Sequence, residues 1–254
     1  MSTDYSHSIR NRLFLVLSRD ELEFAVTDNT LNVLLTGSSA VTDMAMLEDV
    51  LSNTSPLSEI FSSVNLTWSG NTFHCYPTAF TNAQDQRTLF VANHKLRPSE
   101  KLLTGSLSAD IALSYAVDPH FLNSIKKKYP NVVYQHEVEP LFEYVQSEIK
   151  PNNHGLILDS NASRSILLVK TDQQIRLVNQ YDTKDINDVF YYVMLSIEQL
   201  ELDIENATLF WISDTNNTPF SEIQQLFKQY VKNIIAVEMT PAISTTLATS
   251  IACG

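Results

Sequence analysis

The pattern of apolar and polar positions is clearest between residues 155 and 239. Three short stretches come first, 156–159, 166–170 and 175–180, and polar turns separate them. The third stretch alternates between apolar and polar residues, which is the two-residue period of a strand with one buried face. These stretches together predict an antiparallel meander of three strands.

A helix, a strand, a second helix and a last strand are expected after the meander. The apolar positions that share one face of the first helix are Val189, Val193, Ile197 and Leu200. Asp185 or Asn187 can cap this helix, because a short side-chain oxygen accepts from the free N–H groups of the first turn. Residues 208–212 and 234–237 read as strands, and Thr218-Pro219 begins the second helix. Strands that alternate with helices predict a partly parallel sheet with right-handed crossovers.

The pattern of residues 13–37 is similar to that of residues 155–181. Each contains two apolar strands, a polar turn and a third strand, which is expected at 31–35 in the first copy. The turn begins with Thr27-Asp28 in the first copy and with Thr171-Asp172 in the second. An internal duplication of a three-strand unit indicates a two-lobed architecture.

The region between the meanders gives a looser prediction. Helices are expected at 44–51, capped by Thr42 or Asp43, from Asp118-Pro119 to Tyr129-Pro130, and at 140–149. Other expected elements are a hairpin of strands 64–68 and 72–76, a loop or helical turn at 77–86, and strands at 89–91 and 111–117.

The polar stretch Lys150-Pro151-Asn152-Asn153 is the best candidate for a domain boundary. It divides the chain into a first lobe of residues 1–150 and a second lobe of residues 151–254. The uncharged residues 241–251 carry apolar residues four apart, at Ile243, Leu247 and Ile251. This tail is expected to pack back on the body of the protein.

Charge and composition narrow the classes of partner. The chain has 254 residues, of which 44% are hydrophobic and 18% charged, as in folded globular proteins. Its net charge of −12 argues against binding to nucleic acid or to anionic membranes. The one basic cluster, Lys126-Lys127-Lys128, ends a helix, where cations suit the dipole. The sequence contains neither a bilayer-length apolar run nor a signal-peptide pattern, so the cytoplasm is the expected compartment.

Cysteine and histidine spacing predicts no metal centre. The two cysteines, Cys75 and Cys253, have no histidine at zinc-ligand spacing, and the six histidines form neither HxxxH nor HxH. No G-x-S-x-G turn is present either.

Three segments carry a resemblance to a known family: FHCYPTAF at 73–80, YPNVVYQHEVEPLFEYV at 129–145 and DVFYYVMLSIEQLELD at 188–203. They resemble a family of Bacteroidota proteins that carries the label domain of unknown function 3822. That family is similar to the actin-like ATPase fold, an α/β fold of two ribonuclease-H-like lobes with mixed sheets. The element order derived from the periodicity of residues 155–239 agrees with such a lobe.

The resemblance implies ATP and Mg²⁺ as the cofactors, held by one hairpin turn in each lobe. Such turns carry an Asp, then a Gly that lets backbone N–H groups approach the phosphates, then Ser or Thr. The second turn reads Asp159-Ser160-Asn161-Ala162-Ser163, with Asn161 where Gly is expected. The first reads Leu17-Ser18-Arg19-Asp20, with neither Asp nor Gly in pattern. The adenosine position near Asp214 lacks a glycine pair.

These departures favour a cytoplasmic, non-enzymatic interaction or scaffold module with degenerate nucleotide motifs and a protein partner. The alternative is an ATP-binding protein, ATPase or kinase-like phosphotransferase with diverged phosphate loops and Asp159 as its candidate catalytic residue. A third hypothesis is self-association through Tyr191, Tyr192 and the apolar tail. Residual nucleotide binding would involve Ser18, Asp159, Ser160, Asn161, Ser163 and Asp214.

Overall fold

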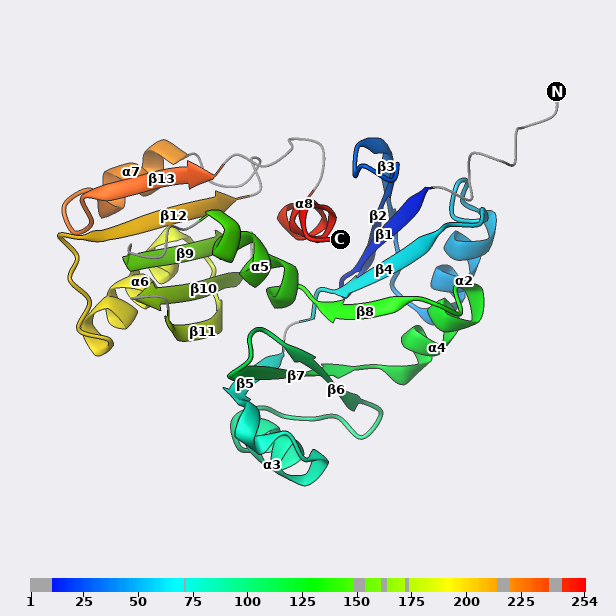
Figure 1. The fold of residues 1–254 in the computed structure, drawn as a ribbon, viewed down its shortest axis with the longest axis horizontal. Coiled ribbons are helices and arrows are strands. Elements are labelled where there is room, and N and C mark those ends of the chain that lie inside the picture. Colours follow the sequence, from blue (N-terminus) through cyan, green and yellow to red (C-terminus); the bar gives the residue numbers. More distant parts are fainter. Residues whose placement is uncertain are drawn as a thin grey trace. The chain divides into compact units, whose positions relative to one another are not determined.

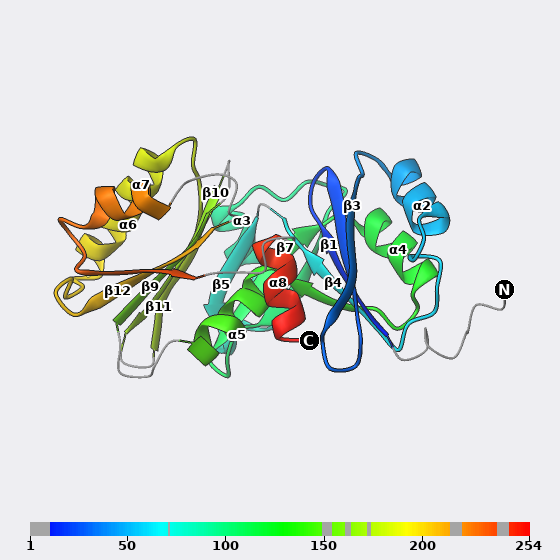
Figure 2. The same ribbon diagram turned by 90° about the horizontal axis from the view of Figure 1, so that it is seen from above.

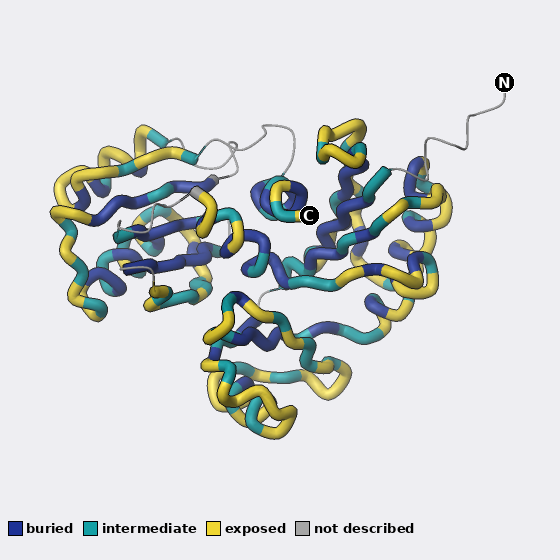
Figure 3. The backbone as a smooth tube through the Cα atoms, viewed as in Figure 1, coloured by how far each residue is buried: buried dark blue, intermediate teal, exposed yellow. Residues whose placement is uncertain are grey.

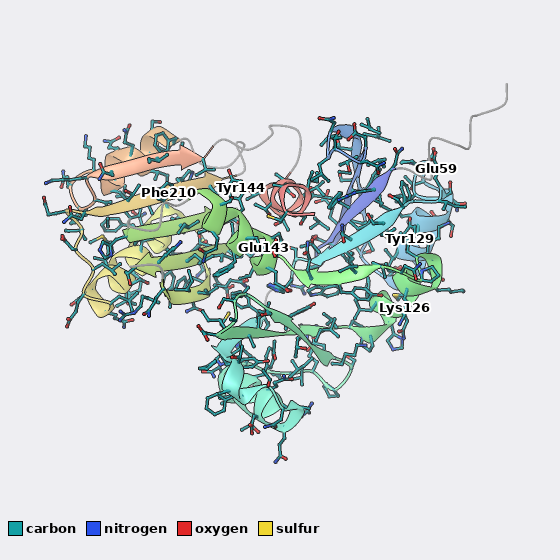
Figure 4. The ribbon with its side chains drawn as sticks, viewed as in Figure 1. Glu59, Lys126, Tyr129, Glu143, Tyr144 and Phe210 are labelled. Carbon is teal, nitrogen blue, oxygen red and sulfur yellow. The ribbon has the colours of Figure 1, made fainter. Side chains whose placement is uncertain are left out.

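The chain folds into two compact units. The structure, a computed structural model, describes residues 11–70, 72–148, 154–160, 164–171, 174–213, 220–237 and 244–254. One unit comprises Met1–Glu143 with Thr246–Gly254, and the other comprises Tyr144–Thr245. The division falls between Glu143 and Tyr144, within helix α5 (Val138–Glu148), whereas the sequence suggested residue 150 (Figure 4).

The first unit is built on a five-stranded mixed sheet. Its strands are β1 (Arg12–Leu17), β2 (Glu21–Thr27), β3 (Val33–Ala40), β4 (Ser63–Trp68) and β8 (Val133–His136), in the order β3-β2-β1-β4-β8. The first three form the predicted antiparallel meander, while β1, β4 and β8 run parallel. The third strand begins at Val33 rather than at Leu31, because Leu31 has a φ of 66° and belongs to the preceding turn. The Asp28 carboxylate holds that turn by accepting from the N–H groups of Thr30 and Asn32.

Helices cover both faces of this sheet. On one face lie α2 (Met44–Asn53) and α4 (Pro119–Lys128), and on the other lie α5 and α8 (Thr245–Ala252) (Figures 1 and 2). Asp43 and Asp118 are the N-caps of α2 and α4, as predicted, and Lys126–Lys128 form the last turn of α4. The Tyr129 hydroxyl then donates to the Leu57 carbonyl over 2.6 Å, which fixes the end of α4 (Figure 4).

A small α/β insert lies between β4 and α4. It contains β5 (Phe73–Pro77), the 3₁₀ turn Thr78–Phe80, α3 (Ala83–Asn93), β6 (Lys101–Ser106) and β7 (Ile111–Val117), with the sheet order β5-β7-β6. The predicted hairpin of 64–68 and 72–76 is wrong, since β4 pairs with β1 and β8 while β5 pairs with β7. The strand predicted at 89–91 is also wrong. Those residues belong to α3, which Asn82 caps by accepting from the Asp85 N–H.

The second unit repeats the strand order of the first. Its elements are β9 (His154–Ser160), β10 (Arg164–Thr171), β11 (Gln174–Asp182), α6 (Ile186–Gln199), β12 (Ala207–Ser213), α7 (Phe220–Phe227) and β13 (Asn233–Val237). The sheet order is β11-β10-β9-β12-β13, which matches the first sheet position by position. The internal duplication read from the sequence therefore has a structural counterpart. Asp185 is the N-cap of α6, as predicted, whereas Thr218-Pro219 lies outside the described residues.

The core of the second unit lies between its sheet and the helices α6 and α7. The predicted helix face supplies Val189, Val193 and Ile197, which pack with Leu158, Leu167 and Trp211 of the strands. Figure 3 shows the central strands of both sheets as buried along most of their length. Among the described residues, no helix combines the length and hydropathy needed to span a membrane.

Candidate functional site

Ser18, a predicted nucleotide-binding residue, closes the turn between β1 and β2. The Ser18 N–H donates to the Glu21 carbonyl over 2.9 Å, and the Ser18 hydroxyl donates to the same oxygen over 3.1 Å. Leu17, directly before it, is fully buried. Ser18 therefore uses its hydroxyl proton within its own turn, while Arg19 at the tip is exposed.

Beside this turn the first unit contains a pocket of about 330 Å³. It opens where the parallel strands β1 and β4 end at Leu17 and Trp68, and ligands of α/β sheets commonly bind at the carboxyl ends of parallel strands. Five of its residues carry hydroxyl groups: Ser18, Thr42, Ser69, Thr72 and Ser99. The other lining residues are Arg19, Trp68, Gly70, Arg97, Glu100, Ala116, Asp118 and Phe121.

Most of the charges around this pocket already have partners. One Glu100 carboxylate oxygen accepts from the Arg97 N–H over 2.9 Å, and the other lies 3.9 Å from the Arg97 Nε. Asp118 accepts from the His120 N–H over 2.8 Å as the N-cap of α4. Only Arg19 among the four charged lining residues has no hydrogen bond or ion pair with a described residue.

A buried carboxylate lies next to the pocket. Glu137 directly follows β8 and is only 2% exposed. Its Oε2 accepts from the Ser69 hydroxyl over 2.8 Å and from the Thr246 hydroxyl over 3.4 Å, and its N–H donates to the Trp68 carbonyl. Glu137 thus joins β4 to α8, and it could not be predicted from a sequence motif because its partners lie far away along the chain.

Glu139, in the first turn of α5, reaches towards the insert. Burial raises the pKa of the Glu139 carboxyl, while hydrogen bonds from the N–H groups of His136 and Ser106 act against that rise. The His136 N–H lies 2.7 Å from Glu139 Oε1, and Gly105 leaves room for the carboxylate against β6. Burial, with Glu139 nearby, also raises the pKa of the Cys75 thiol to about 12. This thiol therefore stays protonated at neutral pH and is not a reactive thiolate.

The rings of two histidines of the insert meet edge to face. The rings of His74 on β5 and His94 after α3 have centroids 5.7 Å apart. Burial lowers the pKa of both imidazoles, and His94 lowers that of His74 further. The described residues contain no group of three or more His, Cys, Asp or Glu side chains that could hold a metal ion.

Hydroxyl groups of the second unit's hairpin are hydrogen-bonded to one another. Ser160 at the end of β9 is 8% exposed, and its Oγ lies 2.8 Å from the Ser165 Oγ of β10. Ser165 lies 3.2 Å from the Thr183 Oγ1, which completes a buried row of three hydroxyls. Asp159 is half-buried on β9, opposite Ile166 and Ile212 of the neighbouring strands. Asn161, Ser163 and Asp214, which the sequence also nominated, lie outside the described residues.

Solved structures similar to this chain share one fold. A Bacteroides thetaiotaomicron protein with actin-like ATPase fold and unknown function is 19% identical, with complete coverage of both chains and a TM-score of 0.85. The PilM–PilN type IV pilus biogenesis complex matches at 10% identity over 91% of this chain and 89% of the other, with a TM-score of 0.58. The ethanolamine utilization protein EutJ from Carboxydothermus hydrogenoformans matches at 9% identity over 95% and 89%, with a TM-score of 0.51.

Comparisons with curated sequences and with family models test to which family the chain belongs. No curated protein sequence matches this chain. The family model described as protein of unknown function (DUF3822) matches residues 2–234, which is most of the chain. The fold expected from the sequence, an α/β actin-like ATPase fold, is confirmed by the structural matches and by the mixed sheets. This chain therefore belongs to the DUF3822 family, a family of unknown function with an actin-like ATPase fold.

Proposed function

We propose that the protein is a cytoplasmic protein-interaction module that keeps the actin-like ATPase fold without turning over nucleotide. The observation that carries this proposal is the buried hydroxyl row of the second hairpin. A hydroxyl that binds phosphate has to be accessible, whereas the Ser160 Oγ is buried and bonded to Ser165. Opening this row to reach a ligand would leave buried hydroxyl groups unpaired, at a cost of about 1–3 kcal/mol each.

The first hairpin supports the same proposal. The Ser18 hydroxyl donates to the Glu21 carbonyl of its own turn, and the turn Leu17-Ser18-Arg19-Asp20 carries neither the Asp nor the Gly of the phosphate pattern. A Cβ and a long side chain at the tip of a turn obstruct the backbone cradle that phosphates require.

The pocket of the first unit is the surface we propose for binding a protein segment. Its hydroxyl groups can both donate to and accept from a peptide backbone, and Trp68 and Phe121 offer apolar contacts. PilM, a neighbour with a TM-score of 0.58, occurs in a complex with PilN, so this fold supports protein partners. A function in protein assembly is the form that we propose for this chain as well.

The test is a thermal-shift scan of the full chain with ATP, ADP and GTP, each with and without magnesium. We expect no change in melting temperature, because a ligand that binds only the native state raises it by mass action. A magnesium-dependent rise of several degrees that disappears in Asp159→Asn would overturn the proposal. Glu198→Gln, an exposed change on α6, is the matched control for the loss of one carboxylate.

A second candidate function is ATP binding or phosphotransfer, with ATP and Mg²⁺ as the cofactors. The specific observation in its favour is Arg19, a cation without a described partner beside five hydroxyl groups. This candidate predicts that the shift with Mg-ATP is lost in Arg19→Gln and that purified protein releases phosphate from ATP. Absence of both signals would overturn this second candidate.

A further inference from the structure

We propose that the pocket of the first unit binds a carboxylate of a partner polypeptide, from an acidic side chain or a chain terminus, and that Arg19 anchors it. This inference rests on the proposed function and adds the chemistry of the partner. It is carried by Arg19, the charged lining residue that has no hydrogen bond or ion pair with a described residue.

Three of the four charged residues that line the pocket are engaged with the protein itself. Arg97 and Glu100 share a backbone hydrogen bond and a longer ion pair, and Asp118 caps α4. Arg19 is the remaining charge, and its guanidinium presents a planar fork of donors that matches a carboxylate in two parallel hydrogen bonds. The two arginines and two acids of the lining balance in formal charge, so the cation left to pair with a ligand is Arg19, in a chain whose net charge is −12.

That net charge also selects among anions. A free polyanion such as ATP approaches against the field of the whole protein, since like charges repel over about a Debye length of ~8–10 Å. A single carboxylate on a peptide meets less repulsion, and its neighbouring residues gain further contacts. The carboxylate of a polypeptide fits this balance better than a nucleotide.

The uncharged lining suits the residues next to such a carboxylate. Trp68 and Phe121 provide apolar surface, and the indole of Trp68 lies so close to Gly70 that a Cβ at that position would collide with it. The volume of about 330 Å³ is at the lower end of ligand pockets, which are commonly about 300–1,000 Å³. We therefore expect a short motif with one acidic group beside one apolar side chain.

The first experiment is a selection of random nine-residue peptides displayed on phage against the full chain. Parallel selections use wild type, Arg19→Gln and, as a control with the same charge change, Arg176→Gln at an exposed position of strand β11. We expect wild type and Arg176→Gln to enrich Asp or Glu next to an apolar residue, and Arg19→Gln to lose the acidic preference. Equal enrichment of acidic residues by all three proteins would overturn the role of Arg19.

The second experiment locates the site by NMR. The chain has two tryptophans, so ¹⁵N labelling gives two indole signals, Trp68 in the pocket and Trp211 in the core of the other unit. A selected peptide should shift the Trp68 signal and leave the Trp211 signal in place. Its dissociation constant should rise about 3- to 10-fold in Arg19→Gln, as expected for one exposed charge-assisted contact. A shift of Trp211 alone would overturn the site.

The possible outcomes distinguish failure of the carboxylate proposal from failure of the proposed function. Selection of neutral apolar peptides that shift Trp68 equally in wild type and Arg19→Gln would keep the interaction module and overturn the carboxylate. Recovery of no peptide at all would overturn both. Displacement of the Trp68 signal by Mg-ATP, but by no peptide, would favour the nucleotide hypothesis. Titration with acetate and with inorganic phosphate distinguishes the bare anion from the polypeptide, because the peptide should bind more tightly than either ion.

Discussion

The hydroxyls of Thr67 and Ser250 lie 2.7 Å apart and are buried, although the two residues are 183 positions apart in the sequence. Thr67 Oγ1 also accepts from Gln135 Nε2 over 2.9 Å, and the Ser250 hydroxyl donates to the Thr246 carbonyl over 2.7 Å. Because the Ser250 hydroxyl gives its proton to the Thr246 carbonyl, the Thr67 hydroxyl is the donor and the Ser250 oxygen the acceptor in this row of hydrogen bonds. The row joins the sheet of the first unit to α8, whose remaining turns carry no charged residue.

Replacement of Ser250 by Ala should lower the free energy of unfolding by about 1–3 kcal/mol, because the buried Thr67 hydroxyl then lacks its acceptor. The measurement is urea unfolding followed by circular dichroism. Thr67→Val combined with Ser250→Ala should cost less than the sum of the two single changes, since it removes donor and acceptor together. Strict additivity would show that the two hydroxyls do not interact.

Glu139 should make the stability of the protein depend on pH. Its pKa is raised in the folded state above the ordinary value of 4.5 by burial, so the folded protein keeps a proton that the unfolded chain has already released. The free energy of unfolding should therefore fall as the pH rises from about 4.5 to the folded pKa, with a slope of at most about 1.4 kcal/mol per pH unit.

Glu139→Gln isolates this contribution from other titrating groups. Unfolding curves of wild type and variant at several pH values should give a difference that declines across this interval and is flat on either side of it. His74 and His94 work in the opposite direction, because their lowered pKa values remove stability as the pH falls below about 6.5. A difference that rises with pH would contradict a Glu139 pKa that burial raises.

Gly70→Ala should disturb the pocket of the first unit without unfolding the protein. The new Cβ would collide with the Trp68 indole, which has to rotate or move, and the strain of such overpacking is typically about 1–3 kcal/mol. We expect a change in tryptophan fluorescence and weaker binding of a selected peptide. Gly37→Ala is the matched control, because its Cβ would meet the ring of Phe24 outside the pocket. Peptide binding should survive that change.

Much of the fold could be predicted because each unit begins with a local pattern. The strands of the two meanders show a two-residue hydrophobic period, and the apolar residues of α6 recur every three or four positions. Asp43, Asp118 and Asp185 cap helices as expected. The insert was less predictable. The apolar residues of β4 and β5 have the pattern of a hairpin. The two strands nevertheless pair with strands that are distant in the sequence, β4 with β1 and β5 with β7.

The candidate site was predictable only where a motif is contiguous. Ser18 and Ser160 lie at the ends of strands and were found from the turn sequences. Ser165, Thr183 and Glu137 were not, because their roles come from side chains that the sheets bring together. No spacing in the sequence predicts that Arg19, Trp68 and Arg97 line one pocket, since strand pairing and the insert create that neighbourhood.

An aromatic row on the second unit allows the hypothesis of self-association to be tested. The rings of Tyr181 on β11 and Tyr192 on α6 stack with centroids 4.1 Å apart, and Tyr191 meets Tyr192 edge-on. Tyr191 is 59% exposed, whereas Tyr192 is partly covered. Tyr192 therefore contributes to the fold, whereas the ring of Tyr191 is the one accessible for self-association.

Tyr192→Ala should lower the melting temperature, because loss of an aromatic stack costs about 0.5–1.5 kcal/mol in addition to the buried area. Tyr191→Ala should leave the melting temperature nearly unchanged, since exposed substitutions usually stay within about ±0.5 kcal/mol. The two variants then separate stability from assembly in sedimentation measurements across a wide concentration range. If copies of the chain associate through this row, Tyr191→Ala shifts the mass towards the monomer at equal stability. A monomeric wild type at every concentration would overturn self-association through this row.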